Sequence, residues 1–358
     1  MFDRKTVRDI DINDKVVLVR ADLNVPLSAS GEIVDDLRIR ASLETLRYLI
    51  ERDARKIVVI SHLGRPEGAV VPSMSLRPVA SRLAELMPGV EIGFVPYVVG
   101  PEAEMAVQSM NERGVLLLEN LRFDAGEEAD DDAFAAAIVD AVRPDVFVQD
   151  GFGVVHRAHA STDAICKLVP SVAGLLLERE VVNLSVAREP VSPSVCIMGG
   201  AKVEDKAPLI EKFSAVYDQV FVGGKIANEY TPAGDLNVTM PVDFVRGPED
   251  NYAYDIGAES TAAIVAAVGE AQTVLWNGTL GMAEKPEYAV SSTAVAEAIG
   301  SREYATTVVA GGDTTAFVEE LQKREPGLKY SLISTGGGAA LEFLLGEKLP
   351  GIEALESK

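Results

Sequence analysis

The chain has 358 residues, of which 47% are hydrophobic and 25% are charged, so it can form a large globular protein of two domains. Its formal net charge of −22 argues against nucleic acid and anionic membranes as partners. No apolar run approaches the roughly 20 residues of a membrane span, the opening residues do not resemble a signal peptide, and two cysteines with three histidines argue against a four-ligand zinc site. We expect a cytoplasmic protein with free, buried thiols at Cys166 and Cys196.

The first half of the chain alternates short apolar runs with amphipathic stretches. This alternation favours a parallel sheet that helices cover on both faces. Ligands of such sheets bind beyond the carboxyl ends of the strands. We expect strands at 15–20, 56–60, 114–118 and 146–148, and helices at 41–52, 76–87 and 134–142.

Basic residues occur close to the ends of all four of these predicted strands. Parallel strands bring their carboxyl ends to one edge of a sheet, and guanidinium groups match carboxylate and phosphate oxygens. Any one of these side chains is more often solvated or structural, but together, in an acidic chain, they predict a site for a small, multiply charged anion. The set comprises Arg38, in the segment leading to the first helix, with His62, Arg65, Arg122, His156, Arg157 and His159, while Arg20, Asp22 and Asn24 follow the first strand.

A helical stretch at 173–188 separates the two halves of the chain. Prolines flank it at Pro170 and Pro190. A helix that connects two domains and an ordinary packed helix explain this pattern equally well.

In the second half, each apolar run leads into glycines. A single glycine turn would be weak evidence, because glycine is routine at the ends of helices and strands. Five such turns predict a ligand face walled by backbone, which suits the phosphates of a nucleotide. The predicted strands are 195–198, 220–222, 273–276, 307–310 and 330–334, and the glycines after them are Gly199 and Gly200, Gly223 and Gly224, Gly278 and Gly281, Gly311 and Gly312, and Gly336, Gly337 and Gly338.

Charged residues accompany these turns. Lys202 and Lys206 are four residues apart, so they share one face of the helix expected after Gly200, whose free N–H groups also favour an anion. Two solvated lysines would explain this segment alone equally simply. Glu284 could accept ribose hydroxyls and Asp313 could hold Mg²⁺. The chain contains neither a P-loop nor a Gly-x-Gly-x-x-Gly turn, which argues against the commonest NTPase and dinucleotide folds.

The motifs of the chain resemble those of the phosphoglycerate kinases from one end to the other, in the order of that family. Three features depart from the family pattern: Thr279 replaces a proline, Ala310 replaces a glycine, and only residues 231–237 separate two segments that a helical crossover usually joins. We expect one surface helix of the nucleotide lobe to be missing. The matching segments are 19–26, 61–66, 118–123, 150–162, 199–206, 276–284, 311–314 and 334–342.

The resemblance implies an α/β fold of two doubly wound, parallel-sheet (Rossmann-like) lobes joined by a helical hinge. Residues 1–170 would form the lobe that binds 3-phosphoglycerate, and the tail at 347–358 would return to it. Residues 171–190 would form the interdomain helix, and residues 191–346 the nucleotide-binding lobe. The lobes would close over the ligands, and the protein would be a cytoplasmic monomer.

The activity that the resemblance implies is reversible phosphoryl transfer between Mg–ATP and the carboxylate of 3-phosphoglycerate, a step of glycolysis. Its implied cofactor is Mg²⁺, and its implied ligands are ATP, ADP and the acid. Arg38, Lys202 and Lys206 would be catalytic. By the same resemblance, the acid would be held by Asp22, Asn24, Arg38, His62, Arg65, Arg122 and Arg157, and the nucleotide by Gly199, Gly200, Lys202, Lys206, Gly223, Gly224, Asn277, Glu284, Gly311, Gly312, Asp313, Thr314, Gly336, Gly337 and Gly338, with Asp313 also holding the metal.

Two other hypotheses stay open at this level. The short segment after Tyr230 is compatible with a catalytically silent family member that only binds nucleotide. A different α/β enzyme that acts on an anionic metabolite, such as another acyl-phosphate kinase, would also use a cationic rim.

Overall fold

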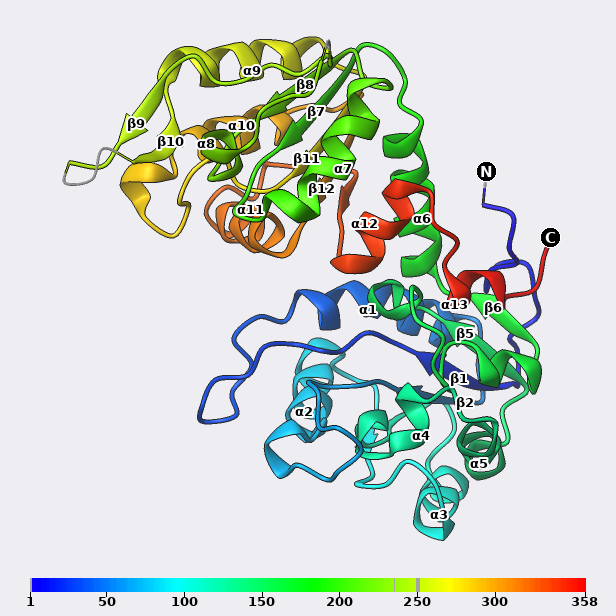
Figure 1. Cartoon of the computed structure of the whole chain (residues 1–358). Helices are drawn as coiled ribbons and strands as arrows, with labels where there is room; N and C mark the ends of the chain where they lie inside the picture. The colour runs from blue at the N-terminus through cyan, green and yellow to red at the C-terminus, as the bar shows by residue number, and fades with distance from the viewer. Residues whose placement is uncertain (1, 235, 249–251) are drawn as a thin grey trace. The chain divides into compact units, whose positions relative to one another are not determined.

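A computed structural model describes residues 2–234, 236–248 and 252–358. The chain divides into two compact units (Figure 1). The first unit comprises Met1–Arg179 and Lys348–Lys358, and the second comprises Glu180–Glu347. The boundary between them falls inside helix α6 (Leu175–Arg188).

The first unit contains a six-stranded sheet in the order β3-β4-β2-β1-β5-β6. Every neighbouring pair is parallel, which confirms the predicted sheet class. The carboxyl ends of all these strands therefore meet at one edge. The strands are β1 (Val16–Arg20), β2 (Lys56–Ile60), β3 (Ile92–Phe94), β4 (Val115–Leu117), β5 (Val146–Gln149) and β6 (Ser171–Ala173).

Helices cover both faces of this sheet. Successive residues of a strand point to opposite faces, so Val17 and Val19 join a core with α1 (Leu37–Glu51) and α2 (Arg77–Leu86), while Val16 and Leu18 join one with α3 (Pro101–Ser109) and α5 (Asp132–Val142). Figure 1 shows α1 on one side of the sheet and α3 and α5 on the other. Short helix α4 (Ala125–Glu128) precedes α5.

Helix α1 begins earlier than the sequence pattern predicts. The expected start at residue 41 is wrong because the buried stripe of the helix already includes Ile39, and because the Leu37 N–H donates to Asp35 Oδ1 at 2.7 Å in the turn that leads into the helix. Arg38 therefore lies in the first turn of α1, not in a segment leading to it.

The second unit repeats the arrangement with a five-stranded parallel sheet in the order β13-β12-β11-β7-β8. Helices α9, α10 and α11 share one core with its strands, and α7 packs against β7 and β8. Its sheet strands are β7 (Ser194–Met198), β8 (Gln219–Val222), β11 (Thr273–Asn277), β12 (Thr306–Ala310) and β13 (Leu332–Ile333), and its helices are α7 (Val203–Ser214), α8 (Ile226–Glu229), α9 (Ala258–Glu270), α10 (Val290–Gly300), α11 (Gly312–Arg324) and α12 (Gly338–Leu345).

A separate antiparallel pair, β9 (Phe244–Arg246) and β10 (Ala253–Ile256), lies outside this sheet. The chain then ends in the first unit. Helix α13 (Pro350–Glu353) lies there, and after it Glu356 O accepts a hydrogen bond from the Lys5 N–H at 2.8 Å, which joins the C-terminal segment to the N-terminal one. Within the described part of the chain, no helix is long and apolar enough to span a membrane.

Candidate functional site

In the first unit, a buried carboxylate orients Arg38. Asp22 follows β1 and is only 3% exposed. Its two oxygens accept bonds from Arg38 Nη1 at 2.9 and 2.8 Å. The Arg38 side chain is 28% exposed, so part of it reaches the surface at the carboxyl edge of the sheet. This pair fixes the orientation of one guanidinium at the carboxyl edge of the sheet. We call the predicted basic set at this edge, Arg38, His62, Arg65, Arg122, His156, Arg157 and His159, the basic rim.

The loop after β2 is tied to the loops on both sides of it. Asn24 Oδ1 accepts the Gly64 N–H at 2.8 Å, and Gly64 O accepts a bond from Arg122 Nη1 at 2.8 Å. Arg122 lies in a short 3-10 turn and also pairs with Glu128 Oε1 at 3.1 Å. These bonds hold Asn24 and Arg122 beside the segment that carries His62 and Arg65.

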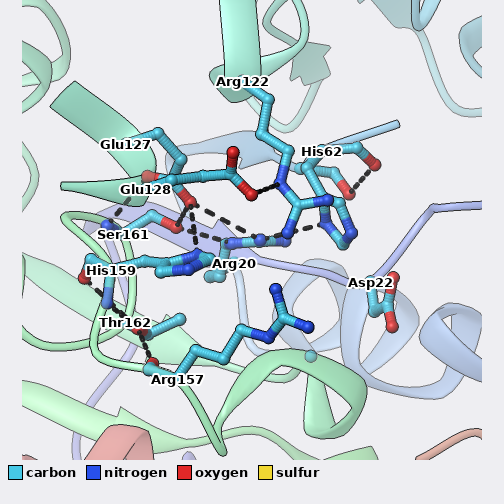
Figure 2. Close-up of polar contacts among 12 residues, drawn as sticks. Arg20, Asp22, His62, Arg122, Glu127, Glu128, Arg157, His159, Ser161 and Thr162 are labelled. Atoms are coloured by element: carbon cyan, nitrogen blue, oxygen red, sulfur yellow. Dashed lines mark hydrogen bonds and ion pairs between the residues drawn. The ribbon is translucent and has the colours of Figure 1, made fainter. Parts of the chain in front are cut away.

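The remaining cations converge on Arg122. Burial lowers the pKa of Arg122, Glu128 opposes this shift, and the nearby charges of Arg157 and Arg65 lower it further. Figure 2 shows Arg122, His62, Arg157 and Asp22 in one cluster. A group of guanidinium charges that repel one another in this way is stabilised by a bound anion.

The histidines of the predicted rim differ from one another. His156 accepts a bond from Arg157 Nε at 3.1 Å, whereas His159 is 5% exposed. Burial, followed by the charges of Arg122 and Arg20, lowers the pKa of His159 to about 4. His159 is therefore neutral near pH 7 and lies beneath the rim instead of adding a charge to it.

Sequence reasoning missed the buried groups under this rim. Arg20, Glu127 and Ser161 are all fully buried and are bonded to one another (Figure 2). Arg20 has a visible signal, since a cation ends an otherwise apolar strand. Nothing local marks Glu127, because its partners are far away in the sequence.

In the second unit, three glycine turns pack backbone against backbone. Gly200 N donates to Thr279 O at 2.9 Å, and Gly224 N donates to Leu280 O at 2.8 Å. A Cβ on Gly199 would lie 2.3 Å from Thr279 O, so a side chain has no room there. The turns after β7, β8 and β11 thus form one continuous backbone surface.

Asn277 and Thr314 join the turn after β12 to this surface. Lys206 Nζ donates to Asn277 Oδ1, and a Cβ on Gly311 would lie 2.6 Å from the same oxygen. The Thr314 hydroxyl accepts the Gly278 N–H at 2.7 Å. Lys206 is therefore held at the carboxyl end of β11.

A cavity of about 170 Å³ opens beside these turns. Gly200, Thr279, Glu284 and Asp313 line one part of it. The aromatic and apolar side chains of Tyr252, Tyr254 and Met282 line the rest together with Lys225, and sequence reasoning did not identify these four as ligand residues.

The carboxylate of Asp313 is the protein group most suited to Mg²⁺ here. It is exposed in the first turn of α11 and shares the cavity with Glu284. Among the residues that the structure describes, no three His, Cys, Asp or Glu side chains form a metal cluster. One carboxylate nevertheless fits Mg²⁺, which binds through one or two carboxylates together with phosphates.

The remaining residues predicted to bind nucleotide lie at the same edge, outside the lining of this cavity. Lys202 is the exposed residue immediately before α7. Gly336, Gly337 and Gly338 follow β13, which is parallel to β12, so this turn also belongs to the carboxyl edge. The turn is held by Thr335, whose N–H donates to Glu180 Oε1 at 2.7 Å.

The chain is similar to many phosphoglycerate kinases. The family model described as phosphoglycerate kinase matches residues 7–242 and 237–347. The phosphoglycerate kinase of Chloroflexus aggregans is 39% identical over 403 residues, covering 99% of each chain, and that of Koribacter versatilis is 36% identical, covering 100% of each. Since these alignments are longer than the 358-residue chain, the relatives contain residues that this chain lacks.

Solved structures agree with this comparison. The phosphoglycerate kinase of Coxiella burnetii has a TM-score of 0.80 and 30% identity, covering 98% of each chain. That of Pyrococcus horikoshii has a TM-score of 0.83 and 28% identity, covering 99% of this chain and 98% of its own. The fold, the sequence motifs and the full-length matches together show that the chain belongs to the phosphoglycerate kinase family.

Proposed function

We propose that the two clusters divide the phosphoglycerate kinase reaction, with the acid held by the first unit and the nucleotide by the second. As a member of this family, the chain is a transferase of glycolysis. It moves a phosphoryl group reversibly between ATP and the carboxylate of 3-phosphoglycerate, giving ADP and 1,3-bisphosphoglycerate. Mg²⁺ accompanies the nucleotide.

The convergence of guanidinium groups on Arg122 is the observation that carries the acid site. The acid bears a phosphate and a carboxylate, and several forked donors can bind both ends at once. Asp22 and Asn24 contribute by fixing the orientation of Arg38 and of the loop at Gly64. The proposed acid-binding residues are Asp22, Asn24, Arg38, His62, Arg65, Arg122 and Arg157.

The backbone surface of the second unit supports the nucleotide site. Its glycines leave room for a ligand to approach the backbone closely, and the N-termini of α7 and α11 contribute N–H groups and positive potential that favour phosphates. We assign the ribose to Glu284 and the metal to Asp313, because both line the same cavity. The other proposed nucleotide residues are Gly199, Gly200, Lys202, Lys206, Gly223, Gly224, Asn277, Gly311, Gly312, Thr314, Gly336, Gly337 and Gly338.

The phosphoryl transfer needs no general base, which explains why both clusters rely on positive charge instead. The acid's carboxylate is already ionised at neutral pH, so it attacks the γ-phosphorus without losing a proton. A bond forms between a carboxylate oxygen and the phosphorus while the bond to the ADP oxygen breaks. Rate enhancement then comes from in-line positioning and neutralisation of the transferring oxygens, which we assign to Arg38, Lys202 and Lys206. Bound Mg²⁺ adds further neutralisation of phosphate charge.

The proposed assignment of one ligand to each unit can be extended to residue ranges of the whole chain. We assign the acid lobe to residues 1–170 with the tail at 347–358, the connecting segment to 171–190, and the nucleotide lobe to 191–346. Transfer requires the two ligands to meet away from water, so movement about the connecting segment is part of the proposed cycle. We further propose a cytoplasmic monomer.

A coupled assay with ATP, Mg²⁺ and 3-phosphoglycerate tests the proposal. We expect turnover by the folded chain and a large loss of kcat in Lys202→Ala. Nucleotide binding in a calorimeter without any turnover would favour a silent family member instead. Turnover with another carboxylic acid in preference to 3-phosphoglycerate would indicate a different acyl-phosphate kinase.

A further inference from the structure

A buried ion pair lies beneath the basic rim of the first unit (Figure 2). Arg20 ends β1, Glu127 lies in α4, and both side chains are fully buried. Arg20 Nη2 is 3.8 Å from Glu127 Oε1. Burial lowers the pKa of Arg20 and raises the pKa of Glu127, so each charge depends on the other for compensation.

Ser161 connects these two charges through its hydroxyl group. The hydroxyl has one hydrogen, which it donates to Glu127 Oε1 at 2.7 Å. Arg20 Nε, which can only donate, bonds the same hydroxyl oxygen at 2.8 Å. The backbone N–H of Ser161 adds a bond to Glu127 Oε2 at 3.1 Å. The ends of this chain of bonds therefore determine the direction of every hydrogen in it.

The chain of bonds continues to His62, whose side chain is almost fully buried. Arg20 Nη2 lies 3.2 Å from His62 Nδ1. A guanidinium has no acceptor, so Nδ1 must be the unprotonated ring nitrogen. Burial, followed by the charge of Arg20, holds the pKa of His62 well below its ordinary value. The ring is thus neutral and carries its hydrogen on Nε2, which no protein group bonds within the described residues.

We propose that Glu127, Ser161 and Arg20 are positioning residues that hold His62 in its Nε2–H tautomer, so that the ring presents a hydrogen-bond donor to the anionic acid. The proposal rests on the acid site proposed above. The opposite tautomer would turn a lone pair toward the anion, and a doubly protonated ring would add another charge to a rim already crowded with guanidinium groups.

A purely structural role for the buried pair predicts something different. Loss of the pair would then lower the stability of the unit and leave the proton on the His62 ring where it was. Removing Arg20 alone would leave Glu127 as a lone buried charge, which could prevent folding. The informative variant is Arg20→Met combined with Glu127→Met, which removes both charges together.

The test measures the His62 tautomer by NMR of the ¹⁵N-labelled full-length protein without ligand. We expect the Nε2–H form in the wild type and a mixture of both neutral forms in the double variant. With substrates present, we expect the KM for 3-phosphoglycerate to rise about 10-fold while kcat and the KM for ATP stay nearly constant. A wild-type ring protonated on Nδ1, or a double variant with an unchanged tautomer, would overturn the proposal.

Two amide substitutions at His62 provide an independent readout. In His62→Gln the amide nitrogen takes the place of Nε2 and can still donate, whereas the shorter His62→Asn side chain reaches only the place of Nδ1, where its oxygen would accept from Arg20, and leaves no donor at the place of Nε2. We expect Gln to retain more affinity for the acid than Asn, and equal losses would contradict the proposal. Glu104→Gln, which breaks the exposed pair with Arg143, is the control and should change neither readout. A wild type that shows the expected tautomer but does not bind the acid would instead refute the proposed function, and with it the role of this donor.

Discussion

The two units present two different surfaces, which we propose bind phosphate-bearing ligands within a chain of net charge −22. In the first unit, long cationic side chains converge above a layer of buried partners, among them Asp22 and Glu127. In the second unit, glycine turns pack backbone against backbone, and the N-termini of α7 and α11 with two lysines supply the positive potential. The first surface depends on the orientation of its charged side chains. The second depends on the absence of side chains at its glycines.

This difference predicts two kinds of sensitivity. A surface of oriented charges fails when a charge or its buried partner is removed, and it weakens with salt. A surface formed by closely packed backbone loses its ligand affinity when a side chain is added at one of its glycines, even without a change in charge. Three of the four predictions below test this contrast and one tests a buried acid of the first unit, and they run from the largest expected effect to the smallest.

The largest effect is expected from Arg38→Ala. Removal of this guanidinium leaves Asp22 buried without its partner and removes a donor from the transferring group. We expect kcat to fall about 100- to 1,000-fold, as for loss of one preorganised donor. The coupled assay measures this fall, and Arg40→Ala on the same helix, which breaks the pair with Asp36, is the control. A fall of similar size in the control would show that α1 was disturbed instead.

The second largest effect is expected from Gly278→Ala in the backbone surface. Gly278 has a φ of +104°, and a Cβ there would lie 2.0 Å from Gly199 O. Strain and overpacking together should cost about 3 kcal/mol of unfolding free energy and weaken Mg–ADP binding. Chemical denaturation and calorimetry measure the two effects. Gly269→Ala is the matched control, since nothing lies within 4 Å of its Cβ, and helix propensity predicts a small gain in stability.

A buried acid of the first unit gives a pH-dependent effect. Burial raises the pKa of Asp150 from 3.8 to about 6, although its Oδ1 accepts the N–H of Leu176 at 3.0 Å. Between these two pH values the folded chain binds a proton that the unfolded chain has lost. The contribution of Asp150 to stability therefore falls as the pH rises from about 4 to 6, by up to about 3 kcal/mol.

Asp150→Asn removes this titration and keeps an oxygen for the Leu176 N–H. We expect the stability of the wild type, relative to the variant, to decrease as the pH rises through this range in urea denaturation. A relative stability that is constant or increases with pH would contradict the pKa direction for Asp150.

The smallest effect is expected from Arg65→Ala. This side chain is exposed, its charge acts on Arg122, and none of the described residues forms a buried ion pair with it. We expect the KM for 3-phosphoglycerate to rise about 10-fold at low salt and the difference from wild type to shrink at high salt. Arg77→Ala, an exposed arginine stacked on Phe94, serves as the control. A salt-independent difference would indicate that Arg65 acts through structure and not through its charge.

Much of this contrast was predictable from sequence because both surfaces follow strand ends. The apolar runs identified β1, β2, β4 and β5 and all five sheet strands of the second unit, and the parallel class followed from their alternation with helices. Strand β3 was missed because Ile92–Phe94 has only three residues and a glycine in the middle. The β9–β10 pair was missed because it begins in a segment without clear alternation of polar and apolar residues.

The deeper layer of the first unit was not predictable in the same way. The cation at the end of the apolar strand β1 marks Arg20, but nothing local identifies its partner, because Glu127 meets Arg20 only through the tertiary fold. His62 was predicted as a ligand residue, but its tautomer depends on the three-dimensional chain of bonds through Ser161. Periodicity and spacing locate elements, whereas the protonation of a buried group depends on contacts between distant segments.

The most direct measurement is calorimetric binding of 3-phosphoglycerate and of Mg–ADP, each alone, to the wild type, Arg38→Ala and Gly278→Ala. We predict that Arg38→Ala loses affinity for the acid and retains the wild-type affinity for Mg–ADP, while Gly278→Ala does the reverse. If Arg38→Ala weakened Mg–ADP binding and left binding of the acid unchanged, the assignment of the two surfaces to the two ligands would be wrong.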